Sequence, residues 1–146
     1  MAEKKMNYLS REFVDAVKNQ LNTDPNYLQK AKNLTGIMAL RALDCPDGTD
    51  KHITYKFDRG RLLEVVHEEE PKPSSKIRNR PFDNSWISRS TSNYEMYTRI
   101  DRGEIGVVQA LTSPNYKIEG SMFKMMRLMS GMTAMNSVVQ RMDKEH

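Results

Sequence analysis

The sequence contains little cysteine and no long run of apolar residues. Cys45 is the only cysteine among the 146 residues, which excludes a framework of internal disulfide bonds and is typical of a reducing compartment. The longest apolar stretches, 36–40 and 105–108, are far shorter than the roughly 18 residues that a membrane-spanning helix needs. The N-terminal segment Met1–Tyr8 lacks the apolar core and the small-residue cleavage site of a secretory signal. We therefore expect a cytoplasmic protein.

Motifs that carry catalytic or metal chemistry are also missing. The sequence has no G-x-S-x-G nucleophile elbow, no Walker loop, no G-x-G-x-x-G, and no H-E-x-x-H or paired-cysteine metal motif. Cys45 stands among carboxylates, which raise the pKa of a thiol and disfavour the reactive thiolate. The three histidines, His52, His67 and His146, favour structural or solvated roles. These absences predict a protein that is not an enzyme and needs no metal ion or cofactor.

Two weak motif matches, one to an RNA-binding loop and one to a calcium loop, fail on chemistry. Gly103-Glu-Ile-Gly106 has the GXXG form of a phosphate-clamping loop, but its acidic residue would repel phosphates. The acidic stretch 44–50 departs from the spacing of a calcium loop, and no glutamate occupies its twelfth position. We therefore predict no nucleic-acid partner, and a turn at 44–50.

The net charge of +4 is unevenly distributed along the chain. Five basic residues follow the acidic run Glu68–Glu70: Lys72, Lys76, Arg78, Arg80 and Arg89. One interpretation is a solvated loop that keeps the protein soluble, and the other is transient contact of residues 72–89 with an anionic membrane.

Hydrophobic periodicity predicts one α+β domain that spans residues 1–146. Apolar residues at helical spacing predict helices over 10–21 and 25–36, and the alternation of Ile53, Tyr55 and Phe57 predicts a hairpin. The strands are expected at 37–43, 52–58, 61–67, 85–91 and 116–119, and further helices at 92–102, at 104–111 and from 120 onward. Three prolines predict a long mobile connection over 68–84. This order favours a roughly five-stranded, mostly antiparallel sheet covered by helices.

The last predicted helix is rich in methionine. It holds seven of the eleven methionines: Met122, Met125, Met126, Met129, Met132, Met135 and Met142. A bend is expected near Ser130-Gly131. Unbranched thioether side chains adapt to irregular partners. Three interpretations stay open: ordinary core, the lining of a ligand pocket, and a surface for a partner helix or a homodimer.

Three segments carry a resemblance to a known family. They are Tyr55-Lys-Phe-Asp-Arg-Gly60, Tyr94-Glu-Met-Tyr-Thr-Arg-Ile-Asp-Arg-Gly-Glu104, and Ala110 to Lys124, which contains Lys117-Ile-Glu-Gly-Ser-Met122. Together they resemble the sterol carrier protein (type 2) family, most specifically over 86–129. The resemblance implies a curved sheet of about five strands whose covering helices leave an internal apolar pocket for a sterol, a fatty acid or a fatty acyl chain. The printed sequence ends in Asp143-Lys-Glu-His146, which differs from a Ser-Lys-Leu peroxisomal address, so peroxisomal targeting is not expected.

Together, the residues and the resemblance predict a non-catalytic carrier of a lipid-like ligand. The expected pocket lining is Phe57, Trp86, Ile100, Ile105, Val108, Leu111, Met122, Phe123, Met126 and Met129. A ligand headgroup is expected to meet Arg89, Arg99 or Arg102. Two alternatives stay open: an oligomerisation or interaction module without a ligand, as the same fold provides in larger enzymes, and an enzyme whose site the motifs do not reveal.

Overall fold

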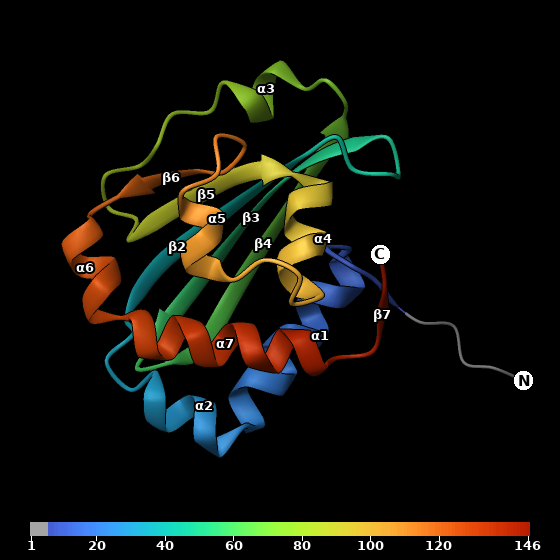
Figure 1. Cartoon of the computed structure of the whole chain (residues 1–146). Coiled ribbons are helices and arrows are strands. Elements are labelled where there is room, and N and C mark those ends of the chain that lie inside the picture. Colours follow the sequence, from blue (N-terminus) through green and yellow to red (C-terminus); the bar gives the residue numbers. More distant parts are fainter. Residues whose placement is uncertain (1–5) are drawn as a thin grey trace, which may run out of the picture.

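A five-stranded mixed sheet forms the centre of the fold. The computed structural model describes residues 6–146, and its strands lie in the order β4-β3-β2-β5-β6 (Figure 1). Their bounds are β2 Gly36–Leu43, β3 Thr49–Asp58, β4 Arg61–Pro71, β5 Ser88–Asn93 and β6 Lys117–Gly120. The β2–β5 pair is parallel and the other three pairs are antiparallel. The predicted α+β class with a mostly antiparallel sheet is confirmed.

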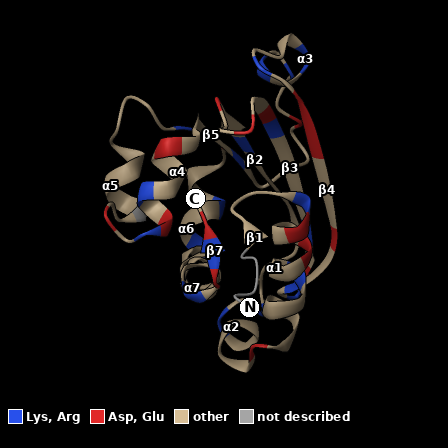
Figure 2. Ribbon diagram, turned by 90° about the vertical axis from the view of Figure 1, so that its right-hand side faces the viewer, with Lys and Arg blue, Asp and Glu red and all other residues tan. Residues whose placement is uncertain are grey.

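Helices from both ends of the chain cover one face of this sheet. They are α1 Arg11–Thr23, α2 Pro25–Lys30, α4 Tyr94–Asp101, α5 Val107–Leu111, α6 Met122–Arg127 and α7 Met129–Arg141. The sheet and the helices on this face form two layers when the molecule is seen from the side (Figure 2). A small parallel pair, β1 Met6–Asn7 with β7 Lys144–Glu145, joins the two ends of the described chain. We call the side covered by these helices the helix-covered face and the other side the outer face.

Side-chain caps and a continuous apolar stripe explain the first two helices. The Ser10 hydroxyl accepts a hydrogen bond from the amide of Phe13, and the Asp24 carboxylate accepts one from the amide of Tyr27. Pro25 occupies the first helical position of α2. Helix α1 follows the prediction closely, whereas α2 ends at Lys30 rather than Gly36. Leu34 and the chain around it instead approach the β3–β4 turn, where its carbonyl accepts a hydrogen bond from the Gly60 amide.

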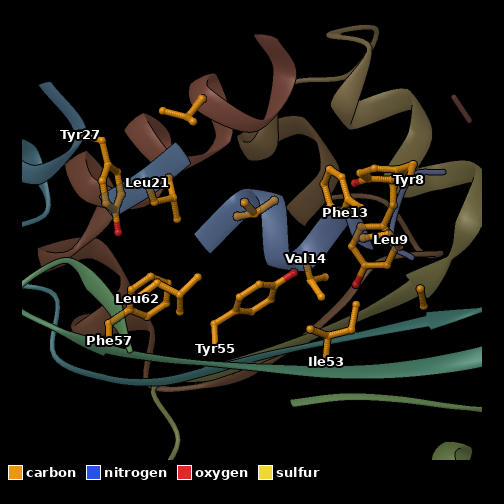
Figure 3. Packing of buried hydrophobic residues seen from close by; sticks show 14 of the residues in the cluster. Tyr8, Leu9, Phe13, Val14, Leu21, Tyr27, Ile53, Tyr55, Phe57 and Leu62 are labelled. Carbon is orange, nitrogen blue, oxygen red and sulfur yellow. The ribbon is translucent and has the colours of Figure 1, made fainter. Parts of the chain in front are cut away.

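The core forms where α1 meets the alternating residues of β3. Ile53, Tyr55 and Phe57 point toward the helix and are almost fully buried (Figure 3). The buried side of α1 facing them comprises Phe13, Val14, Val17 and Leu21. This is the hairpin alternation that the sequence predicts, because successive strand residues point to opposite faces.

The methionine-rich segment is two helices rather than one bent helix. Helix α6 ends at Arg127 and α7 starts at Met129, so the break lies at Leu128, slightly before the predicted Ser130-Gly131. Gly131 has another role, since a Cβ there would come within 2.9 Å of the Ala31 Cα. The missing side chain lets α7 approach α2 closely.

The predicted long mobile connection over 68–84 is wrong at residues 68–71 and 75–78, which form regular structure. Strand β4 continues to Pro71 because its acidic residues pair along β3, and a short helix follows, α3 Ser75–Arg78, with Ile77 fully buried. The guanidinium of Arg41 donates hydrogen bonds to the carbonyls of Ile77 and Arg78, at 3.1 Å each. This segment is held against the outer face, where tertiary partners that periodicity cannot reveal fix it in place.

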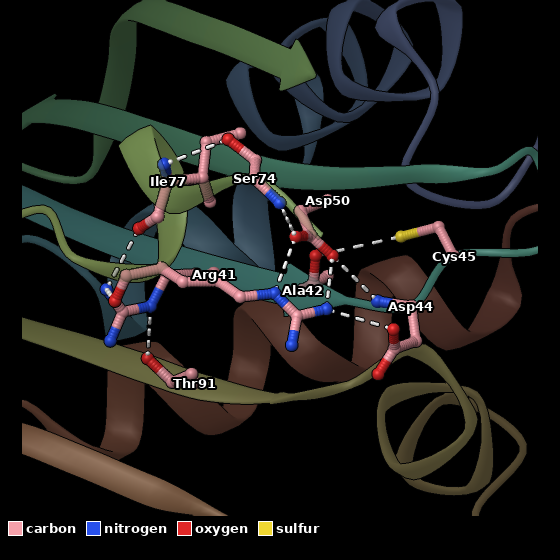
Figure 4. Close-up of polar contacts among 9 residues, drawn as sticks. Arg41, Ala42, Asp44, Cys45, Asp50, Ser74, Ile77 and Thr91 are labelled. Carbon is pink, nitrogen blue, oxygen red and sulfur yellow. Dashed lines mark hydrogen bonds and ion pairs between the residues drawn. The ribbon is translucent and has the colours of Figure 1, made fainter. Parts of the chain in front are cut away.

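Asp50 is the anchor of that segment. Its fully buried carboxylate accepts hydrogen bonds from the Ser74 amide at 2.8 Å, the Arg78 Nε at 2.7 Å and the Asp44 amide at 3.0 Å (Figure 4). Burial alone would raise the pKa of Asp50, but these donors outweigh burial and lower the pKa to about 2.

The lowered pKa of Asp50 predicts that its carboxylate stabilises the folded protein at neutral pH and that this stabilisation is lost in acid. A folded-state pKa below the unfolded value stabilises the fold above pH 4 and loses this effect as the pH falls toward 2. Asp50→Asn should lower the free energy of unfolding by about 2 kcal/mol at pH 7. Urea unfolding at several pH values checks this, because the gap between wild type and variant should close near pH 2. Asp15→Asn, an exposed site on α1, is the control, and a gap independent of pH would contradict the assignment.

Candidate functional site

An apolar cleft lies between the helix-covered face of the sheet and α7. Its volume is about 180 Å³, and it takes side chains from the N-terminal segment, α1, β2, β3, β5, α4 and α7. The lining residues are Tyr8, Leu9, Phe13, Val17, Met38, Leu40, Tyr55, Ser90, Tyr97, Ile100, Tyr116, Met132, Met135, Asn136 and Val139. None of them carries a formal charge at neutral pH.

The few polar groups of this cleft are neutral hydroxyls and one amide. The Tyr97 and Ser90 hydroxyls lie 2.9 Å apart, and Tyr97 also donates a longer hydrogen bond of 3.4 Å to the Arg41 carbonyl. Burial raises the pKa of Tyr97 and Tyr55 well above the ordinary tyrosine value, so both stay protonated. The cleft therefore offers an apolar surface with a short hydroxyl pair and no fixed charge.

A second, smaller pocket of about 70 Å³ opens beside the cleft. We call it the methionine pocket, and it is lined by Leu111, Tyr116, Ile118, Met122, Met125, Met126, Met129, Met132 and Thr133. Tyr116 and Met132 also line the cleft, so these two side chains separate the two spaces. Both spaces are open to solvent. Two larger hollows elsewhere on the surface have mainly polar linings, and a third, of about 280 Å³, includes the charged side chains of Asp47 and Lys51.

Half of the predicted lining residues lie at these two spaces. Ile100 lines the cleft, and Leu111, Met122, Met126 and Met129 line the methionine pocket. The structure thus brings together residues from α4, α5, α6 and α7, as the pattern of the C-terminal half indicates.

The other half of the predicted lining residues lie elsewhere. Phe57 is buried in the core beside Leu62, and Ile105 is buried in a small cluster with Met96, Ile100 and Ala110. The side chains of Val108 and Phe123 are 70% exposed.

Trp86 lies on the outer face of the sheet, opposite the cleft. Its ring centre is 5.6 Å from that of His52, and the Arg89 guanidinium is 5.7 Å from the ring centre. His52 alternates with Ile53 and therefore points away from the core. The sequence predicts a strand from Ser85, but β5 starts three residues later at Ser88. Trp86 therefore lies in the loop that precedes the strand.

The arginines expected at a ligand headgroup are not among the lining residues of either space. Arg89 is buried on the outer face, where its guanidinium lies 3.0 Å from the Glu119 carboxylate. Arg99 is half-exposed and pairs with Glu104 at 3.6 Å, and Arg102 is an exposed residue just after α4.

Sequence reasoning missed the lining that comes from the N-terminal half. Met38 and Leu40 alternate along β2 with Ala39 and Arg41, so alternation alone could have assigned them to the helix-covered face. Phe13 and Val17 belong to the predicted apolar stripe of α1, but a stripe does not reveal which of its members border an empty space.

The described residues 6–146 present neither an activated thiol nor a metal-binding cluster. Burial raises the pKa of the Cys45 thiol to about 12, so this cysteine is not an activated nucleophile. The described residues contain no group of three or more His, Cys, Asp or Glu side chains arranged to hold a metal ion. Across the same residues, no helix combines the length and the apolar character that crossing a bilayer requires.

Solved structures share this arrangement of strands and helices. A crystal structure of a sterol carrier protein 2 superposes with a TM-score of 0.75 at 11% identity, covering 93% of this chain and 99% of the other. A protein of Thermus thermophilus, described as a candidate sterol carrier protein, also gives 0.75, at 12% identity, and covers 98% of this chain and 94% of its own. The chain has the sterol carrier protein fold.

A third sterol carrier structure shows how far relatives of this fold diverge. The ligand-free sterol carrier protein 2 of Yarrowia lipolytica gives a TM-score of 0.55 at 12% identity, covering 97% of this chain and 99% of the other. No family model matches the sequence, and no curated protein sequence matches it significantly. At this identity, the sterol carrier likeness is a likeness of fold.

The partition between the two spaces predicts the effect of one substitution. Met132→Ala removes a side chain shared by the cleft and the methionine pocket, so it should join them at a cost of about 2 kcal/mol in stability. A neutral apolar fluorophore such as N-phenyl-1-naphthylamine should then bind more tightly than to wild type. Met129→Ala is the control, because Met129 lines the methionine pocket but not the cleft. Equal gains for both variants would show that Met132 is not the partition.

Proposed function

We propose that the protein binds an apolar, uncharged lipid-like molecule in the cleft and carries it without chemical change. The observation that carries this proposal is the lining of the cleft, where charged groups are absent from all fifteen residues and three methionines border the space. Hydrophobic burial is non-directional and scales with the apolar area removed from water, so such a lining supports a ligand without demanding one exact shape.

The size of the cleft requires that side chains move when a ligand enters. The cleft and the methionine pocket together fall short of the roughly 300–1,000 Å³ typical of small-molecule sites. Met132 separates them and is only partly buried, so a rotation of its flexible side chain would create one longer space. The ligand-binding residues proposed here are Ile100, Leu111, Met122, Met126 and Met129, together with the cleft residues from α1, β2 and α7.

The charge of the lining favours one class of ligand. An ionised carboxylate inside the cleft would lose its hydration without gaining a cationic partner, which is strongly unfavourable. A hydroxyl, ester or ketone group could instead exchange hydrogen bonds with the Ser90 and Tyr97 hydroxyls. Each methylene removed from water contributes about 0.8 kcal/mol, so about ten methylenes would reach micromolar affinity before ordering costs.

The first test is native mass spectrometry of the purified protein, followed by extraction and identification of any bound lipid. The stripped protein is then titrated with a fatty alcohol and a fatty acid of equal chain length at pH 8. The alcohol should bind at least tenfold more tightly, because the acid must keep its ionised end at an opening of the cleft. A purified protein that carries no lipid and binds neither the alcohol nor the acid would refute the carrier proposal and favour an interaction module.

A variant that fills the cleft locates the binding. Leu40→Trp places a larger side chain in the lining and should weaken alcohol binding at least tenfold. Val66→Trp is the control, because Val66 is exposed on the same sheet and lies outside the cleft. Circular dichroism and thermal unfolding establish that both variants are folded. Full binding by folded Leu40→Trp would place the ligand outside the cleft.

A further inference from the structure

The largest apolar exposure of the described chain gathers on two short helices. We define the α5–α6 patch as Val108, Met122, Phe123 and Met126, whose exposed fractions are 70%, 52%, 70% and 69%. Leu111 joins α5 to the same area, since it lines the methionine pocket together with Met122 and Met126. Clustered large apolar side chains in water usually mark an interaction surface, whereas isolated ones need no explanation.

Cations outnumber carboxylates along the part of the chain that carries this patch, and Glu104, just before α5, pairs with Arg99. Between residues 107 and 142 the sequence has a single carboxylate, Glu119, and that group pairs with Arg89 on the outer face of the sheet. Lys124 and Arg127 on α6 are exposed, and among the ion pairs of residues 6–146 none involves them. The Arg127 guanidinium lies 5.8 Å from the centre of the Phe123 ring, so charge and apolar surface are adjacent.

The basic segment 72–89, the other candidate for membrane contact, has most of its charge neutralised by internal pairs, with Lys72 as the exception. Arg80 forms two hydrogen bonds with Glu68, and Lys76 lies between Glu68 and Glu70. Arg78 is held by Asp50. Basic α3 and acidic β4 lie near each other in Figure 2, which leaves this region less attractive to anions than its sequence suggests.

We propose that the α5–α6 patch docks on the surface of an anionic phospholipid bilayer. Phe123 and Met126 enter the boundary between headgroups and acyl chains, and Lys124 and Arg127 meet the lipid phosphates. This combination of exposed apolar side chains and flanking cations is what interfacial membrane binding requires. Docking does not depend on a ligand in the cleft, although it would place the methionine pocket against the bilayer.

Charge complementarity favours the bilayer over a second copy of the chain. A two-fold dimer through this patch would bring the same surface of each copy together. Lys124 and Arg127 of one copy would then lie near those of the other, and α6 carries no acidic residue to offset them, which is unfavourable in a partly desolvated interface. An anionic bilayer supplies the missing negative charge and the apolar phase at once.

The test is co-sedimentation of the lipid-stripped protein with vesicles of phosphatidylcholine, with or without about 30% phosphatidylglycerol. Anionic vesicles should bind the protein at least tenfold more tightly than neutral vesicles, and added salt should weaken that binding. Phe123→Asp/Met126→Asp and Lys124→Glu/Arg127→Glu should each reduce binding at least tenfold. The substituted side chains are exposed, so both variants should fold, and circular dichroism checks that they do.

Two matched controls decide where the contact lies. Leu63→Asp changes an exposed apolar residue of β4, and Lys72→Glu/Lys76→Glu reverses two charges of the segment 72–89. Both should bind anionic vesicles like wild type. The proposal is overturned if the protein binds neutral and anionic vesicles equally, or if only the Lys72/Lys76 variant loses binding. It is also overturned if the protein binds no vesicles but forms a concentration-dependent dimer that Phe123→Asp/Met126→Asp abolishes. A failure of ligand uptake in the cleft would leave each of these readouts unchanged.

Discussion

The parallel pairing of β2 with β5 is the constraint on which the rest of the structure depends. Strand β4 ends at one edge of the sheet, so the chain must cross the sheet before β5 can pair with β2. The crossing segment needs partners on the outer face, and Asp50 and Arg41 provide them through backbone amides and carbonyls. Every element that closes the cleft from the C-terminal side, from α4 to α7, follows β5 in the chain. The polar outer face therefore sets the position of the apolar site on the other face.

Local patterns were sufficient where a signal repeated within one element. Ser10 with the stripe from Phe13 to Leu21 predicted α1, and the alternation through Ile53, Tyr55 and Phe57 predicted the hairpin. They failed where the partner is distant in the chain. Glu68, Glu69 and Glu70 look like a solvated run, but Lys51 and Arg80 pair with two of them from other elements. Such pairs convert a polar sequence into an ordered strand, and no periodicity reports them.

The candidate site was half predictable for a related reason. Methionines of the C-terminal helices are distinctive, so Met122, Met126 and Met129 could be chosen before the fold was known. Trp86 could not be placed, because it lies just before β5 and the face it takes depends on where that strand starts. Phe57 has the same alternation as Tyr55, yet only Tyr55 borders the cleft. The helix that packs on an apolar face decides which of its residues are covered and which border the cleft.

Methionine links the packing of this fold to its proposed use. Met132 packs against the main core, separates two small spaces and remains only partly buried, so it contributes to the core while keeping freedom to move. A leucine there would hold a better-defined rotamer and a more fixed partition. Met122 and Met126 line the methionine pocket and are also exposed on the surface of α6, so flexible methionine side chains continue from the pocket to the surface. A continuous path of adaptable side chains thus runs from the cleft to the patch, and a ligand moving along it would stay in apolar surroundings throughout.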